Sequence, residues 1–493
     1  MSNGTLSLSN FEDYFSKKAI FFWYLFLLCI GRVSVLFTQF PAYVGGDTIS
    51  YRPISPPPTS IPENIYWPQT LWGDSTRGLL PVSFFHLFSS DNARMIAQSA
   101  VSLTSWSLLG FSFYILCRVE RTRNLHLIFI LLILLIFALS PEVTSWNKIL
   151  YSESLAISSM LLGISLLILY KYRRRKLLFF SLYLCCSFLT FTARPSYLLI
   201  LLAVLPILVF RYFKEVRIFV RIASVAFLLI IIFAYQSNNN QYWSERLWSR
   251  EMISVSYYMS QDNPHADSFI PLVNNDFKKP LCVPNVDSPL TANQQLVWSL
   301  PFNFQKLCPE ASDWASKRFY PILFEWWRTE PKDALNTYRL AFISSLRSLP
   351  LFDQVTPVPR PIHDLFLPSV DSQVMYPDIY NDGPDTQPRP FFDPLFLTVA
   401  IFFSVFRKQG AVKIKNLNGL VSSFHFLLLG AVAAWLFGIV AIPGPPREVY
   451  RLAVLPELLI RMLIPICLTF YTFKNFNASG RKDRSTKPQS PKL

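Results

Sequence analysis

The feature that most restricts the fold of this chain is a series of ten apolar runs, each about 15 to 24 residues long. They span residues 19–40, 95–117, 125–140, 153–170, 177–193, 196–212, 218–235, 392–406, 420–442 and 450–473. A helix needs about 20 apolar residues to cross the hydrocarbon core of a bilayer, so the shorter runs must borrow flanking residues. With 52% hydrophobic residues over 493 positions, the pattern excludes a soluble protein. It predicts an all-α polytopic membrane protein with about ten transmembrane helices.

The basic residues predict which side of the membrane each loop faces. About half of the 46 Lys and Arg residues lie in the N-terminal segment 1–18, in alternate short loops and in the tail 474–493. The positive-inside rule places these segments in the cytoplasm, so the net charge of +15 reflects topology and does not indicate nucleic-acid binding. We therefore expect a multi-pass protein of a bacterial inner (plasma) membrane with both termini in the cytoplasm. A eukaryotic endoplasmic reticulum membrane is the alternative.

This topology divides the chain into a membrane core, 19–235, and a C-terminal group of transmembrane helices, 392–473. The core includes a long outer loop, 41–94, for which we expect amphipathic juxtamembrane helices. Between the two membrane parts lies an extracytoplasmic segment, 236–391, which we expect to be partly helical, particularly within 314–349. The remaining outer turns are short.

Several charged residues lie at the ends of apolar runs that the topology places on the outer side. They are Asp47, in the stretch GGDTISY, and Glu142, Lys148, Glu153, Arg194 and Arg447. If these ends face one side, their side chains converge on one region at the outer leaflet. Simpler roles stay open, because Asp47 fits a turn or a helix cap, Glu153 fits a helix N-terminus, and the arginines fit contacts with lipid headgroups.

The cysteines agree with the same division. Cys29, Cys117, Cys185, Cys186 and Cys467 fall in apolar runs. Cys282 and Cys308 are alone in the outer segment, so we predict a disulfide between them, with two free buried thiols as the alternative. No zinc-binding spacing occurs, and we predict no dedicated metal site, although carboxylates could still hold Mg²⁺ or Mn²⁺.

An ordered series of short motifs carries a resemblance to a known family. After GGDTISY come ALSP ending at Pro141, YSESL around Glu153, TARPSY from Thr192 to Tyr197, EPKDALNTY from Glu330, and REVYR from Arg447 to Arg451. This order resembles the GT-C superfamily of membrane glycosyltransferases, in a layout like that of protein mannosyltransferases. It covers roughly residues 20 to 470. The chain departs from the pattern in lacking an adjacent acidic pair beside Asp47, and segment 236–391 matches no part of it.

The resemblance implies transfer of a sugar from a polyprenyl-phosphate-linked donor to an extracytoplasmic acceptor. The acceptor would be a cell-envelope glycan, a glycolipid or a protein. Such a transfer needs a base for the acceptor hydroxyl and cations for the departing phosphate. We assign the base to Asp47 and the phosphate contacts to Arg194, Arg447, Arg451 and Lys148. Supporting or substrate contacts are assigned to Tyr51, Glu142, Glu153 and Tyr197. Membrane lipids are the remaining partners, and no cofactor is firmly implied.

Other functional classes remain as alternatives. A transporter or flippase of lipid-linked saccharides would also use an outer cationic pocket, but it would carry polar residues at the centres of its spans. These centres hold almost no ionisable residues, which favours a one-sided enzyme. An oligosaccharide ligase would rely on the large outer segment, where His265, Arg360 and His363 lie. A catalytically inactive assembly scaffold is a further alternative.

Overall fold

The structure, a computed structural model, describes nine stretches of the chain. They are residues 16–38, 79–120, 124–148, 152–172, 174–193, 213–242, 309–336, 415–441 and 458–469, together with residues 42, 122, 150, 197, 200, 268–269, 272, 276 and 455–456. Regular secondary structure in these ranges is helical throughout. The helices are α2 (Lys17–Thr38), α3 (Leu79–His86), α4 (Asp91–Val119), α5 (Asn124–Leu139), α6 (Pro141–Lys148), α7 (Ser152–Tyr172), α8 (Lys176–Ala193), α10 (Ile218–Tyr242), α14 (Pro309–Thr329) and α18 (Lys415–Ala441). Another apolar helix covers Leu458–Thr469.

The apolar helices confirm the all-helical class and suit a membrane protein. Within the described residues, α2, α4, α7 and α8 are long and apolar enough to cross a membrane. Shorter apolar stretches are α5, Ile218–Phe233 within α10, Ser423–Leu436 within α18, and Leu458–Thr469. The predicted spans 392–406 and 196–212 lie outside the described residues, apart from Tyr197 and Ile200. The count of about ten spans therefore stays a prediction.

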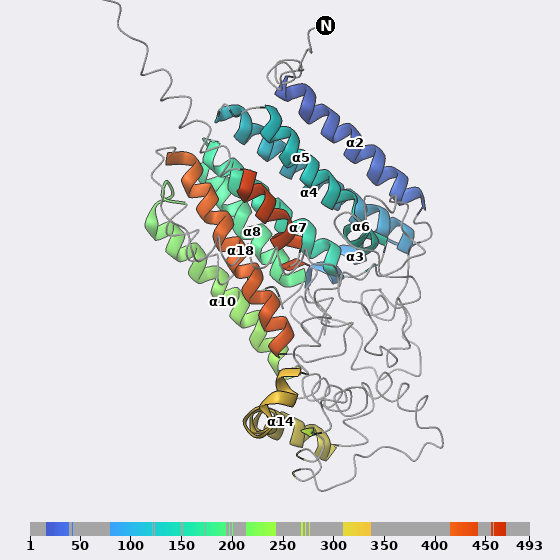
Figure 1. The fold of residues 1–493 in the computed structure, drawn as a ribbon, viewed down its shortest axis with the longest axis vertical. Coiled ribbons are helices and arrows are strands. Elements are labelled where there is room, and N and C mark those ends of the chain that lie inside the picture. Colours follow the sequence, from blue (N-terminus) through green and yellow to red (C-terminus); the bar gives the residue numbers. More distant parts are fainter. Residues whose placement is uncertain are drawn as a thin grey trace, which may run out of the picture.

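Helix α7 forms the centre of the bundle, with α4 and α8 packed on it (Figure 1). In its 18-residue apolar stretch, 94% of α7 is buried inside the protein, compared with 28% for the corresponding stretch of α2 at the edge of the bundle. Helices α7 and α8 lie in contact at Gly163, where an added Cβ would lie at an ordinary van der Waals distance of 3.7 Å from the Cβ of Cys186. The hydroxyl of Ser165 donates to the carbonyl of Leu161 at 2.7 Å, so this polar group satisfies itself within the helix.

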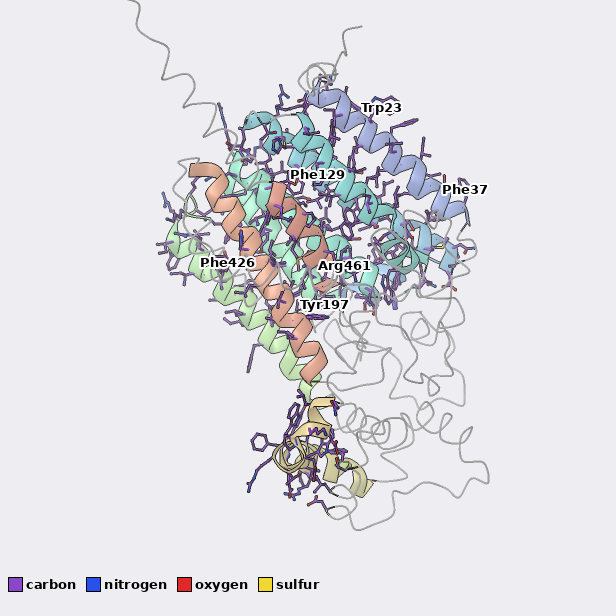
Figure 2. All side chains as sticks on the ribbon, viewed as in Figure 1. Trp23, Phe37, Phe129, Tyr197, Phe426 and Arg461 are labelled. Carbon is purple, nitrogen blue, oxygen red and sulfur yellow. The ribbon has the colours of Figure 1, made fainter. Side chains whose placement is uncertain are left out.

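Helix α2 packs against α4 and α5 along one stripe and exposes apolar residues on its other side. The buried stripe comprises Ile20, Phe21, Tyr24, Leu28, Arg32 and Val35. The exposed set comprises Phe22, Trp23, Phe26, Leu27, Ile30, Val33 and Phe37, and Figure 2 shows Trp23 and Phe37 at the outer edge of the bundle. This second face suits contact with lipid.

Two glycines let α2 approach its neighbours. A Cβ at Gly110 of α4 would collide with the ring of Tyr24, and one at Gly31 would lie 2.6 Å from Leu139 at the end of α5. The Tyr24 hydroxyl donates to the carbonyl of Trp106 at 2.9 Å, which fixes the ring in place. The glycines therefore set the spacing of α2 from α4 and α5.

The bundle has two chemically different ends. At one end, which we call the α6 end, α2, α5 and α8 finish, α4 and α7 begin, and α6 lies between α5 and α7 (Figure 1). The opposite end, which we call the basic end, carries Lys17, Arg118, Lys171, Arg174, Arg175, Lys176, Lys214 and Arg217. There the ammonium group of Lys176 donates to the carbonyl of Tyr170 at 2.6 Å and pairs with Glu215 at 3.1 Å.

Two helices lie in the segments predicted as outer loops. Helix α3 falls in the loop 41–94, but its sequence LLPVSFFH is apolar almost throughout, so the expected amphipathic pattern is wrong for this helix. Helix α14 falls in segment 236–391 and lies beyond the lower end of α10 in Figure 1. Its Trp326 is fully buried, and the indole nitrogen donates to the hydroxyl of Ser268 at 2.9 Å. This segment is therefore partly helical, as expected.

We predict that Gly110→Ala lowers the free energy of unfolding by about 1 to 3 kcal/mol, because the new methyl group forces the hydrogen-bonded Tyr24 ring to move. Gly163→Ala is the matched control: its Cβ meets only ordinary contacts, and alanine favours a helix by about 0.5–1 kcal/mol. Thermal unfolding in detergent should show a loss for the first variant and none for the second. Equal stability of both variants would contradict the close packing of α2.

We also predict opposite sidedness for the two ends. A cysteine at Ser89, between α3 and α4, should react with a membrane-impermeant maleimide in intact cells. A cysteine at Arg174, between α7 and α8, should react only after permeabilisation, because positively charged loops stay in the cytoplasm. The unaltered protein, labelled in parallel, measures the reaction of its native cysteines. Reversed labelling would show that the predicted topology is inverted.

Candidate functional site

The carboxyl group of Glu153 is the main ionisable group at the α6 end. Glu153 lies in the first turn of α7 and is fully buried, and the hydroxyl of Ser152 donates to its Oε2 at 3.2 Å. The first turn of a helix has free backbone N–H groups and a positive dipole end, both of which stabilise a negative charge. The local sequence thus places an acidic side chain in the interior of the bundle, at the N-terminus of α7.

Helix α6 is held beside Glu153 by side chains from α4 and α7. Gln98 of α4 is fully buried, and its Nε2 donates to the carbonyl of Trp146 at 2.7 Å and of Asn147 at 3.3 Å. Ser154 of α7 donates to Oδ1 of Asn147 at 2.6 Å. The last carbonyls of a helix lack partners within the helix, so Gln98 satisfies groups that would otherwise be unpaired.

Helix α3 is attached to the same end through Arg94 of α4. Arg94 is 4% exposed, and its Nε and Nη2 each donate at 2.8 Å to a backbone carbonyl, of Phe85 and of Phe88 respectively. Its Nη1 pairs with Asp91 at 2.7 Å. A guanidinium group at the C-terminus of α3 therefore binds the carbonyls that end the helix and also has its own counter-ion. All three guanidinium nitrogens of Arg94 are therefore engaged in contacts that hold α3 to α4.

His86, the last residue of α3, lies close to this arginine. Partial burial, and then the positive charge of Arg94, lower the pKa of its imidazole below the ordinary value. His86 is therefore neutral at pH 7, and the α6 end gains no positive charge from it.

Of the predicted site residues, the structure describes four, and it places all four toward the α6 end. Glu153 and Tyr197 are buried, at 0% and 1% exposure. Tyr197 follows α8 by four residues, and Figure 2 shows it in the lower part of the bundle. Glu142 and Lys148 lie on α6, with their side chains outside the described set. Their roles, and the convergence of their side chains on one region, stay predictions.

The remaining predicted residues lie outside the described residues. They are Asp47, Tyr51, Arg194, Arg447, Arg451, Cys282 and Cys308. Their roles, and the disulfide between the two cysteines, stay predictions. The five described cysteines, Cys29, Cys117, Cys185, Cys186 and Cys467, are free thiols.

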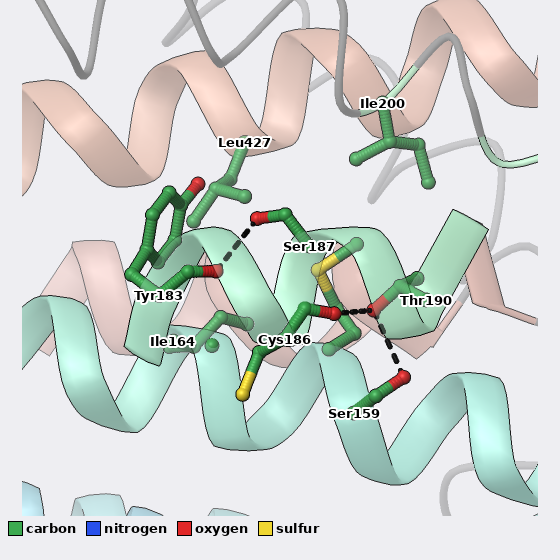
Figure 3. Close-up of a pocket in the computed structure, with 10 residues that line it drawn as sticks. Ser159, Ile164, Tyr183, Cys186, Ser187, Thr190, Ile200 and Leu427 are labelled. Atoms are coloured by element: carbon green, nitrogen blue, oxygen red, sulfur yellow. Dashed lines mark hydrogen bonds between the residues drawn. The ribbon is translucent and has the colours of Figure 1, made fainter. Parts of the chain in front are cut away.

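A small cavity lies deeper in the bundle, between α7, α8 and α18 (Figure 3). Its hydroxyl groups are engaged: Thr190 and Ser159 share a hydrogen bond of 2.9 Å, and Ser187 donates to the carbonyl of Tyr183 at 3.0 Å. About 10 Å³ is open to the centre of a water molecule, roughly the room that one water needs. The cavity is therefore too small for a sugar or a lipid headgroup.

No metal site appears among the residues that the structure describes. No three His, Cys, Asp or Glu side chains in these ranges gather closely enough to hold a metal ion. The chemistry of the α6 end, as far as it is described, rests on the fully buried Glu153, which accepts a hydrogen bond from Ser152.

Sequence reasoning missed the buried arginines within the apolar runs, and Arg32 is the first of them. It lies within the first apolar run and is 7% exposed. His425 and Arg461 are also buried, on α18 and on Leu458–Thr469. The expectation that the spans are almost free of ionisable groups therefore needs correction. The signal for Arg32 was its spacing of four and eight residues from Leu28 and Tyr24, which places it on the packing face of α2.

Comparisons with protein-family models, with curated proteins and with solved structures found no match for this chain.

The attachment of α6 can be tested with two serines one turn apart on α7. Ser154→Ala should lower the free energy of unfolding by about 1 to 3 kcal/mol, because it leaves the buried Asn147 Oδ1 without its donor. Ser158→Ala is the control, since the Ser158 hydroxyl is buried and has no partner in the described part of the chain. Hydrogen exchange should show faster opening of α6 in Ser154→Ala alone. Equal exchange in both variants would argue that this bond does not hold α6.

Proposed function

We propose that this protein transfers a sugar from a polyprenyl-phosphate-linked donor to an extracytoplasmic acceptor, with the reaction at the α6 end of the bundle. The observation that supports this proposal best is the burial of Glu153, hydrogen-bonded by Ser152, at the same end of an apolar bundle as the hydrogen-bonded polar groups of Ser154, Asn147 and Gln98. Burying a carboxyl group in an apolar bundle costs free energy even when it is hydrogen-bonded, so such a group is a candidate for a functional role. The concentration of these polar groups at one end suits a one-sided enzyme.

In the proposed reaction, the acceptor hydroxyl attacks the anomeric carbon of the sugar while Asp47 takes its proton. The bond from the anomeric carbon to the phosphate oxygen breaks, and the polyprenyl phosphate leaves with the bonding electron pair. Arg194, Arg447, Arg451 and Lys148 neutralise the phosphate, because guanidinium groups bind two phosphate oxygens at once and an ammonium group adds a point charge. Glu153 and Tyr197 support the site from within the bundle.

The location of the site also fits the charge of the two ends. The basic end carries the Lys and Arg residues named above and would face the cytoplasm. The α6 end would then face the periplasm or another extracytoplasmic space, where a lipid-linked sugar is a suitable donor. We therefore propose a bacterial inner membrane as the location, and a cell-envelope glycan, glycolipid or protein as the acceptor.

A transporter or flippase of lipid-linked saccharides is the second candidate. The burial of Arg32, His425 and Arg461 within apolar helices favours it, since transporters bind their substrates through polar groups inside the membrane. The two functions differ in one measurable respect: an enzyme forms a new glycosidic bond, whereas a flippase moves an unchanged lipid.

We predict that Asp47→Asn lowers sugar transfer by at least about 100-fold while the protein remains folded, because an amide cannot accept the acceptor proton. Membranes that contain the protein would be incubated with a panel of radiolabelled polyprenyl-phosphate sugars, and label in the acceptor fraction would be counted. Glu325→Gln, which changes an exposed carboxylate on α14, is the matched control and should keep full activity.

Two results would count against this assignment. Full transfer by Asp47→Asn would remove Asp47 from the mechanism. Movement of intact labelled donor between leaflets, with no product formed by the unaltered protein, would favour the flippase.

A further inference from the structure

Arg32 occupies a position where the packing of α2 calls for an apolar side chain. The buried stripe of α2 continues in steps of four from Tyr24 through Leu28 to Arg32. The residues on either side, Gly31 and Val33, face α5 and the exposed surface respectively. Arg32 therefore points into the seam between α2 and its neighbours α4 and α5, and not toward lipid.

The level of Arg32 along the bundle follows from two contacts. Tyr24 bonds to the carbonyl of Trp106, and Arg32 lies eight residues, or about 12 Å, closer to the α6 end. Because α4 runs in the opposite direction, the same distance along α4 leads from Trp106 to about Gln98, which donates to the carbonyls of α6. Gly31 contacts Leu139, the last residue of α5. Arg32 thus lies at the depth where α5 ends and the polar groups of the α6 end begin.

The guanidinium group of Arg32 has no hydrogen-bond partner in the described part of the chain. All three of its nitrogens are buried and make no hydrogen bond to any described residue, and the same is true of the hydroxyl of Ser99, next to Gln98 on α4. A guanidinium group keeps its charge in proteins, so it cannot avoid the cost of burial by losing a proton. An unpaired buried charge within a membrane span is among the most costly arrangements known in proteins.

Among the side chains that the structure describes, the helices around Arg32 supply no counter-ion for it. Helix α5 contains no acidic residue, and Asp91, the one acidic residue of α4, is bonded to Arg94. Helix α6 contains Glu142, whose side chain lies outside the described residues. The charge of Arg32 is therefore uncompensated by the described side chains of the helices that pack on α2.

We infer that Arg32 is part of a binding site for the phosphate group of a membrane lipid, at the α6 end between α2, α4 and α5. A planar guanidinium group binds two phosphate oxygens at once, and the Ser99 hydroxyl can donate to a third. Lipid has direct access to this helix, since Ile30, Val33 and Phe37 on the other side of α2 are exposed. Because the guanidinium nitrogens are enclosed by the chain, binding requires the last turns of α2 to move apart from α4 and α5.

The choice of a polyprenyl phosphate as the lipid rests on the proposed function, whereas phosphate binding by Arg32 does not. The purified full-length protein would be titrated with a short-chain polyprenyl monophosphate, with the matching polyprenol and with phosphatidylglycerol, and binding would be followed by native mass spectrometry. We expect Arg32→Gln to weaken binding of the polyprenyl phosphate by about 10- to 100-fold, as expected for a charged hydrogen-bonded pair. Arg118→Gln at the basic end is the matched control and should bind as the unaltered protein does.

A second measurement separates ligand binding from an internal ion pair. Without added lipid, Arg32→Met should raise the melting temperature, because it replaces an unpaired buried charge by an apolar side chain of similar length. The polyprenyl phosphate should then stabilise the unaltered protein but not the variant. A lower melting temperature of Arg32→Met without lipid would overturn the inference, because it would show that the charge already has a partner within the chain.

The remaining outcomes are equally decisive. Equal binding by Arg32→Gln and the unaltered protein would overturn the site. Phosphatidylglycerol binding as tightly as the polyprenyl phosphate, and with the same loss in Arg32→Gln, would overturn the choice of a polyprenyl carrier. If the unaltered protein transfers no sugar but still binds the polyprenyl phosphate through Arg32, the proposed reaction is wrong and this inference stands.

Discussion

The hydrogen bonds from Gln98 to the carbonyls of Trp146 and Asn147 are the contacts on which the α6 end depends. They connect the first part of α4 to a short helix that has only two turns of its own and is therefore unstable in isolation. The bond from Ser154 to Asn147 connects the same helix to α7. With α6 fixed from both sides, the chain can pass from α5 to α7 while Glu153 enters the interior.

The long helices were predictable from the sequence, and the reason is physical. A run of about 20 apolar residues has few other stable arrangements in a bilayer, so α2, α4, α7 and α8 follow from length and composition alone. The short helix α6 was not predicted, and α3 was expected only as an amphipathic helix somewhere in loop 41–94, because both helices depend on tertiary partners such as Gln98 and Arg94. Gln98 lies 48 residues before Trp146, so only the fold brings these two together. Arg94 lies nine residues after Phe85, and its contact depends on how the turn between α3 and α4 folds.

The candidate site was predictable only in outline. The positions of Glu142, Lys148, Glu153 and Tyr197 at one end follow from the order of the apolar runs. The hydrogen-bond partners of Glu153 and the burial of Gln98 depend on how helices pack, which periodicity does not reveal. Arg32 was overlooked for the opposite reason: averaging over an apolar run hides a single charge, although the spacing from Tyr24 and Leu28 placed it on the buried face. The proposed donor contacts at Asp47, Arg194 and Arg447 rest on the sequence alone.

The short length of α5 has a consequence for the bilayer around the protein. Its 16 residues extend about 24 Å, less than the hydrocarbon thickness of about 30 Å, while the adjacent α2 extends about 33 Å. Since Leu125, Phe129 and Leu132 of α5 are exposed, lipid touches this short helix directly. Hydrophobic mismatch then thins the bilayer locally, so that headgroups beside α5 lie several ångströms deeper than those beside α2. The protein thereby draws lipid headgroups toward the depth of its own buried polar groups.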